Sequence, residues 1–562
     1  MGHLYVGIDL GTTNSTVSVI QTKERRLREP IEHLRSIPII QYNEKFEITR
    51  DKMTLPSYFH CKNDGNEKRA YTGEWAKHIY ATGNQPMNTF TGIKTRLGGE
   101  SLISIPGKSE DDELHLDMTQ CSALLLKTIK KSIEEQFEQD IDQLVVTVPA
   151  AFNSDERQAT KEAIEIAGFE NFHILDEPVA TLLYFINNGD GSLMESSVDI
   201  NGKNIMIYDI GGGTLDICIA KVEEDDTAYE YDNMKVSIIS RSKREDLGGN
   251  DFDQYLGAYF LSEFEKRTKK ISTRPMEEQN QIIARVVSQA ERYKIDMNNK
   301  IREYIDNPRR LAKIVMNPEF EVIEGQFVQG INLDKKTLEE VFASLTKDSD
   351  RQNILRPVKE SIKSADNLNK EDISLVILTG GMSNFYAVES VLKEYFGDNT
   401  PIITVDTTTS VSKGAAIDAY NSMEDNVDLI KMDLEDRLAE DIFIRTNEGF
   451  EKLISRDEIS KKKTGEFTYV IPSENMVRLP IFLFYGQDPN FTEDFSQIAG
   501  KMIDLPRRFE VGEEITLIWE IDENGVITIS MEELGASIEL NQDANKELAE
   551  KKKTVDEIVL NQ

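Results

Sequence analysis

Apolar and polar positions alternate in two stretches of the chain that share one design. Residues 4–9 form an apolar run that ends on Asp9, bends through a Gly-Thr-Thr turn and continues as a second alternating run. Residues 205–209 end on Asp209, bend through three glycines and a threonine, and continue in the same way. Because a period of two is typical of half-buried strands, each stretch predicts a strand–turn–strand hairpin.

The residue types in the two turns suit a chain of phosphates. Glycines let the backbone approach an anion and point successive N–H groups at it, and threonine hydroxyls add donors without charge. The carboxylates of Asp9 and Asp209 would repel bare phosphate, so they indicate a hard cation, most simply Mg²⁺ with retained waters. Two such hairpins facing each other predict a site for a polyphosphate and a metal.

Strands and amphipathic helices alternate through the first three quarters of the chain. Residues 144–148 predict a strand that breaks at Pro149, and a helix follows from Ser154, the expected N-cap. Residues 374–379 predict another buried strand. This alternation predicts α/β architecture in two related halves over residues 1–425.

Short strands with few helical runs follow, at residues 442–446, 467–471, 479–485 and 515–521. The clearest pair is a hairpin at residues 515–531, where Asn524 and Gly525 favour a turn of type I′. The pattern predicts an all-β domain over residues 435–540. A short polar tail over residues 541–562 can form at most one short helix.

Residues 426–434 join the two parts and carry an unusually apolar run flanked by acids. We expect an interdomain linker there. A first strand, or the end of a helix, belonging to the β domain is the alternative.

Composition excludes several classes of function. The 562 residues include 100 Asp and Glu against 65 Lys and Arg, a formal net charge of −35. We therefore expect no binding to nucleic acid or to anionic membranes, which needs clustered basic surface. Three cysteines lie far apart, with neither disulfide nor zinc spacing, which favours a reducing compartment. With no signal peptide and no apolar run near the ~20 residues of a membrane span, we expect a soluble, cytoplasmic protein.

Two other nucleotide-binding motifs are not supported. Gly107-Lys108-Ser109 is similar to the end of a P-loop, but Leu102 stands where that motif needs Gly. No strand leads directly into a helix there. No G-x-G-x-x-G follows a strand either, so a dinucleotide-binding Rossmann domain is not expected.

The motifs closely resemble those of the DnaK-type heat-shock chaperones of the seventy-kilodalton class, within the actin-like ATPase superfamily. The resemblance covers residues 3–425 strongly and 427–540 weakly. It rests on residues 7–15 (GIDLGTTNS), 146–153 (VTVPAAFN), 176–178 (DEP), 209–216 (DIGGGTLD), 247–253 (LGGNDFD) and 379–381 (TGG). It implies an actin-like ATPase domain of two duplicated halves and a β-sandwich that binds peptide. The implied cofactors are ATP or ADP with Mg²⁺, and K⁺ is a further candidate.

The resemblance assigns roles in catalysis and nucleotide binding. Lys94 would reach the γ-phosphate and the attacking water, which Glu177 and Thr214 would position. Asp9 and Asp209 would order the water shell of Mg²⁺. A solvated lysine and an acid at a helix N-terminus are the alternatives for Lys94 and Glu177. The other residues matched to the nucleotide are Gly11, Thr12, Thr13, Asn14, Gly211, Gly212, Gly213, Gly248, Gly249, Glu291, Lys294, Asn298, Gly380, Gly381 and Asn384.

The adenosine end departs from the family pattern. Asn384 stands where the family usually has an Arg stacked on adenine, and Thr408 replaces an acidic residue near the base. ATP remains the expected nucleotide. The missing Arg removes a cation–π contribution, so we expect an altered affinity.

Further departures concern partners. His173 and Asp176 stand where the family has an Arg and an Asn used by J-domain co-chaperones, and Lys431 interrupts the leucine run of the linker. The resemblance therefore implies a dedicated J-domain co-chaperone, with extended client peptide and a nucleotide-exchange factor as further partners. Pro149 and Arg157 match positions that relay the nucleotide state to the linker. A strand terminator and a solvated helix charge are their alternatives.

The β domain resembles the peptide-binding sandwich of the family. Phe450, Tyr469, Leu479 and Ile481 align with apolar positions of the peptide cleft, and packing in the core is the alternative. The family adds a helical lid where this sequence stops. We therefore expect a lidless cleft that exchanges peptide quickly.

One main hypothesis and two alternatives result. The main hypothesis is an ATP-dependent molecular chaperone whose ATP hydrolysis controls the affinity of the β-sandwich for extended apolar segments of client proteins. The alternatives are an actin-like kinase for a small molecule and a low-turnover ATP-sensing module with one dedicated partner.

Overall fold

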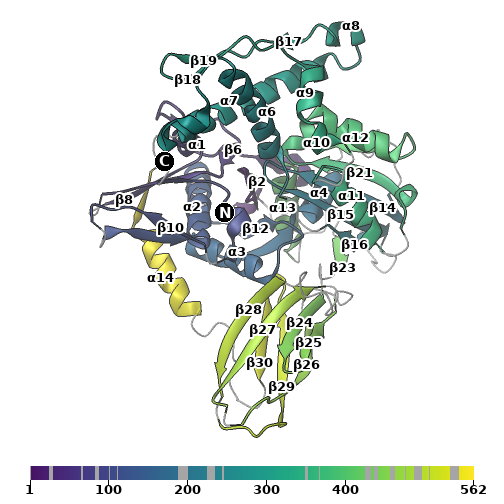
Figure 1. Ribbon diagram of the computed structural model, residues 1–562. Coiled ribbons are helices and arrows are strands. Elements are labelled where there is room, and N and C mark those ends of the chain that lie inside the picture. The colour runs from purple at the N-terminus through teal and green to yellow at the C-terminus, as the bar shows by residue number, and fades with distance from the viewer. Residues whose placement is uncertain are drawn as a thin grey trace.

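The computed structural model describes residues 2–23, 30–64, 67–82, 88–99, 101–109, 112–187, 200–224, 234–242, 246–347, 352–365, 368–423, 432–435, 441–455, 463–474, 476–486, 496–505, 507–531 and 544–561. These residues form two α/β lobes, a β-sandwich that lies at the bottom of Figure 1, and a final helix and strand drawn in yellow. None of the helices in these ranges is long and apolar enough to cross a membrane.

The sheet of the first lobe contains the first predicted hairpin. Strand β1 pairs antiparallel with β2 and parallel with β12, and β12 pairs parallel with β13. The hairpin and the strand predicted at residues 144–148 are therefore confirmed. In order across the sheet, the strands are β13 (Phe172–Asp176), β12 (Gln143–Val148), β1 (His3–Asp9), β2 (Asn14–Thr22) and β3 (Leu34–Ser36).

The sheet of the second lobe repeats this pairing pattern. Strand β14 pairs antiparallel with β15 and parallel with β21, which pairs parallel with β22. The second hairpin and the strand predicted at residues 374–379 are confirmed as well. The order is β22 (Ile402–Thr404), β21 (Ile373–Thr379), β14 (Lys203–Ile210), β15 (Leu215–Glu224), β16 (Met234–Arg241) and β23 (Met432–Glu435).

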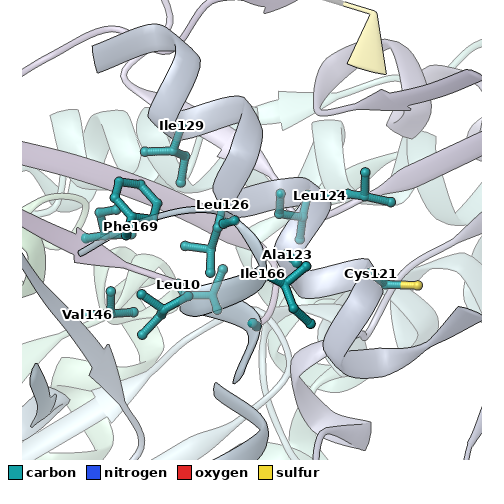
Figure 2. Packing of buried hydrophobic residues seen from close by; sticks show 14 of the residues in the cluster. Leu10, Cys121, Ala123, Leu124, Leu126, Ile129, Val146, Ile166 and Phe169 are labelled. Atoms are coloured by element: carbon teal, nitrogen blue, oxygen red, sulfur yellow. The ribbon is translucent and has the colours of Figure 1, made fainter. Parts of the chain in front are cut away.

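Alternate residues of β1 face two different cores. Leu4 and Val6 pack into a core formed with α2 (Met118–Gln136) and α3 (Ser154–Ile166), which Figure 2 shows from close by. Tyr5 faces the other way, into a core formed with α4 and α13. We call the first of these the first-lobe core and the second the central core.

The central core joins the two lobes. It also contains Ile205 and Ile207 of β14, together with side chains of α4 (Glu177–Asn187) and α13 (Ser410–Asn421). The residues that alternate with these in β14 face a third core, formed with α6 (Gly249–Glu265) and α7 (Met276–Glu303). The ends of both predicted hairpins are thus fixed relative to each other by one packed interior.

The three cysteines are buried in these cores. Cys61 and Cys121 belong to the first-lobe core and Cys218 to the central core, and all three are free thiols. Burial raises the pKa of Cys61 to about 12 and also raises the pKa of Cys121.

The β-sandwich consists of two antiparallel sheets. One has the order β25 (Gly449–Ile454), β24 (Asp441–Thr446), β27 (Arg478–Gly486) and β28 (Ser496–Asp504), and the other has the order β26 (Lys463–Val470), β29 (Glu514–Ile521) and β30 (Ile527–Met531). Strands β25 and β28 were not among the predicted strands. Charged side chains interrupt the apolar alternation in β25, where Glu451 and Lys452 are exposed.

The hairpin β29–β30 turns differently from the prediction. Pairing closes at Ile521 and Ile527, so the loop is longer than two residues. Gly525 has a φ of +76°, but Asn524 does not share the positive φ that type I′ requires at both central positions. The Asp522 carboxylate accepts hydrogen bonds from the backbone N–H of Asn524 (2.8 Å) and of Val526 (2.9 Å), which closes the longer loop.

Helix α3 is also capped differently from the prediction. Its N-cap is Asn153, whose side chain accepts a hydrogen bond from the Glu156 N–H (3.0 Å). The Glu156 carboxylate accepts in return from the Asn153 N–H (2.9 Å), which completes a capping box. Ser154 is therefore the first helical residue, and its hydroxyl is available for another partner.

The expected linker and tail both add strands to the lobes. Of residues 426–434, those before Met432 lie outside the described residues. Strand β23 pairs parallel with β16 at the edge of the second-lobe sheet, not with the sandwich as the alternative had it. The tail forms one helix, α14 (Ala544–Asp556), which the prediction allowed, and then strand β31 (Ile558–Asn561), which it did not include.

Candidate functional site

The two predicted hairpin turns face each other closely. A Cβ atom added to Gly212 would lie 2.0 Å from the Thr13 hydroxyl oxygen, and one added to Gly213 would lie 2.9 Å from the Thr12 methyl carbon. The Thr13 hydroxyl is buried and has no hydrogen-bond partner among the described residues. A buried hydroxyl without a partner between two glycine-rich turns fits the phosphate oxygens that the sequence predicted there.

Two further glycine loops close on the same turns. The Gly249 and Asn250 N–H groups donate to the carbonyls of Gly211 (3.0 Å) and Gly212 (2.6 Å). A Cβ atom at Gly380, where φ is +82°, would lie 2.4 Å from a carboxylate oxygen of Asp209. A Cβ atom at Gly380 would also lie 2.5 Å from the Ile210 carbonyl oxygen, so only glycine fits at this position without movement of the backbone.

Buried carboxylates line the ends of the central strands. Asp9 ends β1, and the Thr147 hydroxyl lies 3.5 Å from its carboxylate. Burial, followed by the charge of Glu177, raises the pKa of Asp9 to about 7. Burial also raises the pKa of Asp209, with Glu177 and Asp216 adding to the effect. This surplus of negative charge fits a bound cation.

Lys94 and Glu177 form a buried ion pair beside these carboxylates. Lys94 begins the 3₁₀ helix η3 (Lys94–Arg96), and Glu177 is the first residue of α4. The two residues are 5% and 8% exposed, which removes the solvated-lysine alternative for Lys94. The structure therefore brings Lys94 and Glu177 together as the sequence analysis required for a shared water.

The donor set fits Mg²⁺ held through water rather than by a full protein cage. Within the described ranges, no group of three His, Cys, Asp or Glu side chains could hold a metal directly. Asp9 and Asp209 offer two carboxylates, and Mg²⁺ commonly binds one or two carboxylates together with waters and substrate phosphates.

The residues matched to adenosine lie on α7 and the turn that faces it. Lys294 donates to the Gly249 carbonyl (2.8 Å) and pairs with Asp253 (2.8 Å). Asn298 donates to the Asn384 carbonyl (2.9 Å) and accepts from the Tyr386 N–H (2.9 Å), so both ends of its amide have protein partners.

Glu291 reaches across to the first lobe. Its carboxylate pairs with Lys77 of α1 (Glu74–Thr82) at 2.8 Å. The pair joins the two lobes. Nothing in the sequence around Lys77 pointed to this contact.

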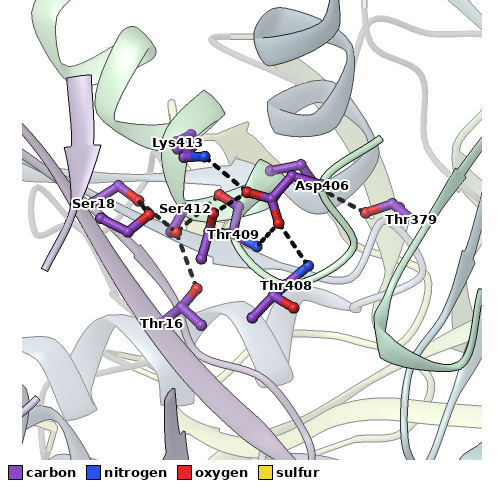
Figure 3. A network of polar contacts seen from close by, with 10 residues as sticks. Thr16, Ser18, Thr379, Asp406, Thr408, Thr409, Ser412 and Lys413 are labelled. Atoms are coloured by element: carbon purple, nitrogen blue, oxygen red, sulfur yellow. Dashed lines mark hydrogen bonds and ion pairs between the residues drawn. The ribbon is translucent and has the colours of Figure 1, made fainter. Parts of the chain in front are cut away.

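A polar network surrounds Thr408, the residue matched to the family's acidic position near the base (Figure 3). Thr408 and Thr409 donate through their N–H groups to Asp406 (3.1 and 3.0 Å), and Lys413 pairs with it at 2.8 Å. Burial alone would raise the pKa of Asp406, but the hydrogen bonds from Lys413 and Thr409 lower it to about 2. The carboxylate of this turn is therefore Asp406, two residues before Thr408.

Arg157, expected as a relay residue, lies at the centre of a buried network. Its guanidinium donates to Asp176 (2.6 Å), and Arg241 donates to the other oxygen of the same carboxylate (2.7 Å). The Arg157 side chain is buried, which removes the solvated-charge alternative. Pro149 follows β12 directly, and its carbonyl accepts from the Phe152 N–H (3.0 Å).

The β29–β30 loop of the sandwich contacts this network. Asn524 accepts a hydrogen bond from the Ile174 N–H at its side chain (3.0 Å), and its carbonyl lies 3.5 Å from an Arg157 nitrogen. Ser154 accepts from the Ile527 N–H (2.9 Å) and donates its own N–H to the Tyr485 hydroxyl (3.0 Å). Arg241, Tyr485 and Asn524 were not predicted as functional residues; the Asn-Gly sequence indicated only a turn.

The positions matched to J-domain contacts have partners within the chain. His173 pairs with Asp418 at 2.6 Å, and Asp176 is buried between two arginines. In this arrangement the Asp176 carboxylate does not reach the surface.

The positions matched to the peptide cleft lie mostly inside the sandwich. Tyr469, Leu479 and Ile481 belong to its hydrophobic core, which corresponds to the packing alternative. Phe450 is partly exposed and lies edge-on to Phe484, with ring centroids 4.9 Å apart.

Comparison with known proteins agrees with the motifs. The family described as Hsp70 protein matches residues 5–562. The chaperone protein DnaK of Thermosipho melanesiensis (strain DSM 12029 / CIP 104789 / BI429) is 28% identical over 539 residues, which cover 95% of this chain and 79% of that protein. The chaperone protein DnaK of Thermosipho africanus (strain TCF52B) is also 28% identical, over 95% of this chain and 78% of its own length. The chain belongs to the Hsp70 family.

Proposed function

We propose that this protein is an ATP-dependent molecular chaperone in which the nucleotide site controls how tightly the β-sandwich holds extended apolar peptide. It is an ATPase of the Hsp70 family. The observation that carries the proposal is the pair of facing glycine–threonine turns beside the buried Lys94–Glu177 pair. The shared pairing order of the two sheets supports an origin by duplication within an actin-like domain.

The residues at the two facing turns and beside them would have distinct roles in hydrolysis. Backbone N–H groups of the two turns and the Thr13 hydroxyl would hold phosphate oxygens. Asp9 and Asp209 would hold Mg²⁺ through waters, and that ion supplies charge neutralisation at the phosphates when it is bound. Glu177 would orient the attacking water, and Lys94 would stabilise the charge that develops on the transferred phosphoryl group.

Coupling to the sandwich would run through α3. Helix α3 begins beside Pro149, carries Arg157, and contacts the sandwich at Ser154. A shift of α3 relative to β13 would break the two hydrogen bonds that Asn524 accepts across this interface, one from Arg157 and one from the Ile174 N–H. We infer that the nucleotide state biases docking of the sandwich and of strand β23 in this way.

The proposed partners follow from the same surfaces. Extended client peptide would bind the sandwich. A J-domain co-chaperone would meet a surface without the Arg and Asn that the family uses, because His173 and Asp176 replace them and are engaged internally. This supports a dedicated co-chaperone. A nucleotide-exchange factor would act at the Lys77–Glu291 contact between the lobes.

Steady-state ATPase activity with and without an extended apolar peptide tests the proposal. Stimulation by peptide is the expected result, since peptide binding and docking compete for one sandwich. Turnover that peptide leaves unchanged, or tight ATP binding without turnover, would contradict the chaperone and favour an ATP-sensing module. A small-molecule kinase would instead transfer the phosphate to an added acceptor.

A further inference from the structure

Residues 544–561, which we call the strap segment, lie on the first lobe rather than on the sandwich that precedes them. Strand β31 pairs parallel with β8 (Lys68–Thr72), in register from Ile558 opposite Lys68 to Asn561 opposite Tyr71. It thereby completes a four-stranded sheet with the order β31, β8, β7 (Phe59–Asn63) and β9 (Thr89–Phe90). Helix α14 packs on α2 and α3, on the left of Figure 1.

The apolar side chains of the strap segment are part of the first-lobe core. Val555 and Ile558 are buried in that core, and Leu548 and Leu560 pack against it. Within β31 the alternation is clear, because Ile558 is 5% exposed whereas Val559 is 46% exposed. Burial of this apolar face stabilises the binding of the strap segment to the first lobe.

Ion pairs and a hydrogen bond also hold the strap segment on the first lobe. Lys551 pairs with Asp117 (3.2 Å) on one side and Glu162 (3.3 Å) on the other. Its carbonyl also accepts a hydrogen bond from the Gln120 side chain (3.2 Å). Further pairs join Lys127 to Asp556 (2.5 Å) and Lys68 to Glu557 (3.3 Å).

The sandwich is consequently attached at both of its ends. Before it, strand β23 is paired into the second-lobe sheet; after it, the strap segment is paired into the first lobe. Residues 532–543 join Met531 of β30 to Ala544 of α14 and can span at most about 47 Å even when fully extended. The sandwich therefore cannot move farther than this from the strap segment while the strap segment stays bound.

We propose that the strap segment is a second tether, which keeps the sandwich close to the nucleotide-binding lobes when their interface opens. Both ends of the sandwich are then attached to the lobes, so its docking is an intramolecular event. The second attachment raises the effective concentration of the sandwich at α3. This role does not require ATP turnover, so it can fail or hold independently of the proposed chaperone cycle.

Cutting the tether without removing any residue tests the proposal. A protease site inserted within residues 532–543 allows the full chain to be cleaved after purification, with the uncut protein as control. Hydrogen exchange at the Ile174 and Ile527 amides reports opening of the interface, since both N–H groups donate across it. We expect cleavage to reduce their protection roughly tenfold or more, with hairpin β1–β2 unaffected.

Several outcomes would overturn the proposal. Unchanged protection at Ile174 and Ile527 after cleavage would show that the second attachment does not hold the sandwich. An equal loss of protection in hairpin β1–β2 would show that the segment only stabilises the first lobe. Dissociation of the cut strap segment at micromolar concentration would show that it binds the first lobe too weakly to hold the sandwich.

A pair of neighbouring substitutions in β31 provides a second test. Ile558→Asp places a charge in the first-lobe core and should release the strap segment, with the same loss of protection at Ile174 and Ile527. Val559→Asp is the matched control, because that side chain points to solvent and should leave protection unchanged. Equal effects of the two substitutions would contradict binding of the strap segment through Ile558 in the first-lobe core.

Discussion

At the scale of single residues, the charge of one lysine stabilises several buried carboxylates. Lys94 pairs with Glu177, and its charge also lowers the pKa of Asp9 and Asp209 against the larger effect of burial. Removal of this lysine therefore affects both the water that Glu177 would orient and the charge balance of the cation site.

We expect Lys94→Ala to lower the ATPase rate by about 10²-fold or more, since it removes a preorganised cation from the transition state. ATP binding, measured by calorimetry, should remain. Lys108 is an exposed lysine in Gly107-Lys108-Ser109, which does not form a P-loop. Lys108→Ala is therefore the matched control and should keep full activity. Combining Lys94→Ala with Glu177→Gln should restore part of the thermal stability, because Glu177 is then no longer a buried charge without its partner, but it should not restore activity. Near-normal turnover of Lys94→Ala would contradict the assigned role.

Asp155 should make stability depend on pH. Burial, followed by the charge of Glu156, raises the pKa of Asp155 from 3.8 to about 7. Between these values the folded state binds more protons than the unfolded state, so stability falls as the pH rises from about 4 to about 7. Asp155→Asn should therefore stabilise the protein above pH 7 by about 2 kcal/mol, less than the full shift allows because the group is partly hydrated.

Thermal unfolding at pH 4 and pH 8 measures this difference. The gain from Asp155→Asn should be present at pH 8 and absent at pH 4. Asp140→Asn removes an exposed carboxylate and should change neither value. A gain of equal size at both pH values would rule out titration of Asp155 as the cause.

At the scale of elements, helix α13 is closely packed against α4 and against the sheet of the first lobe. A Cβ atom at Gly414 would lie 1.7 Å from the Ala180 carbonyl oxygen of α4, and one at Gly7 of β1 would lie 2.2 Å from the Ala416 backbone nitrogen of α13. The helix therefore depends on glycine at both contacts, because no rotamer change can relieve a clash with backbone.

Gly414→Ala should destabilise the protein by about 3 kcal/mol, the upper end of the cost of overpacking a core. Chemical denaturation measures this cost. Gly99→Ala is the control, since a Cβ atom there would lie 3.5 Å from its nearest neighbour. A loss no larger than that of the control would show that α13 can shift without cost.

The sequence predicted those elements whose signals are local. Both hairpins, strand β12 and strand β21 follow from alternation and from the glycines at their ends. The cap of α3 was misassigned because Asn153 and Ser154 are both good cap residues, and only the reciprocal bond with Glu156 decides between them. Strand β31 was missed because its partner, β8, lies almost five hundred residues earlier.

The site was predictable to a similar degree. The turns and carboxylates lie on the ends of predicted strands, so the pattern placed them together. Lys77, Tyr485 and Asn524 act through contacts between segments distant in the sequence, and no local pattern reports such contacts. Asp406 was predicted only in part. The resemblance indicated an acidic residue in this turn at the position of Thr408, and the acidic residue of the turn lies two residues earlier.

At the scale of the whole molecule, docking of the sandwich depends on hydrogen bonds made by the β29–β30 loop. Asn524 alone contributes contacts to both Ile174 and Arg157. A buried amide left without its acceptor costs about 1–3 kcal/mol.

Asn524→Ala should therefore weaken docking and reduce the ratio of peptide-stimulated to basal ATPase activity, while ATP affinity stays the same. The ratio is measured in one assay with saturating peptide. Glu520→Ala, on the exposed face of β29, is the matched control. An unchanged ratio in Asn524→Ala would remove this residue from the coupling path.

The buried cysteines have a practical consequence for chemical labelling. Thiolate is the reactive form, and burial with a raised pKa keeps Cys61 and Cys121 almost wholly protonated near neutral pH. Alkylating reagents and mild oxidants should therefore spare them for as long as the first lobe remains folded. A fluorophore can be attached to a new surface cysteine without replacing the natural ones, and modification of Cys61 and Cys121 then marks the moment at which the first-lobe core opens.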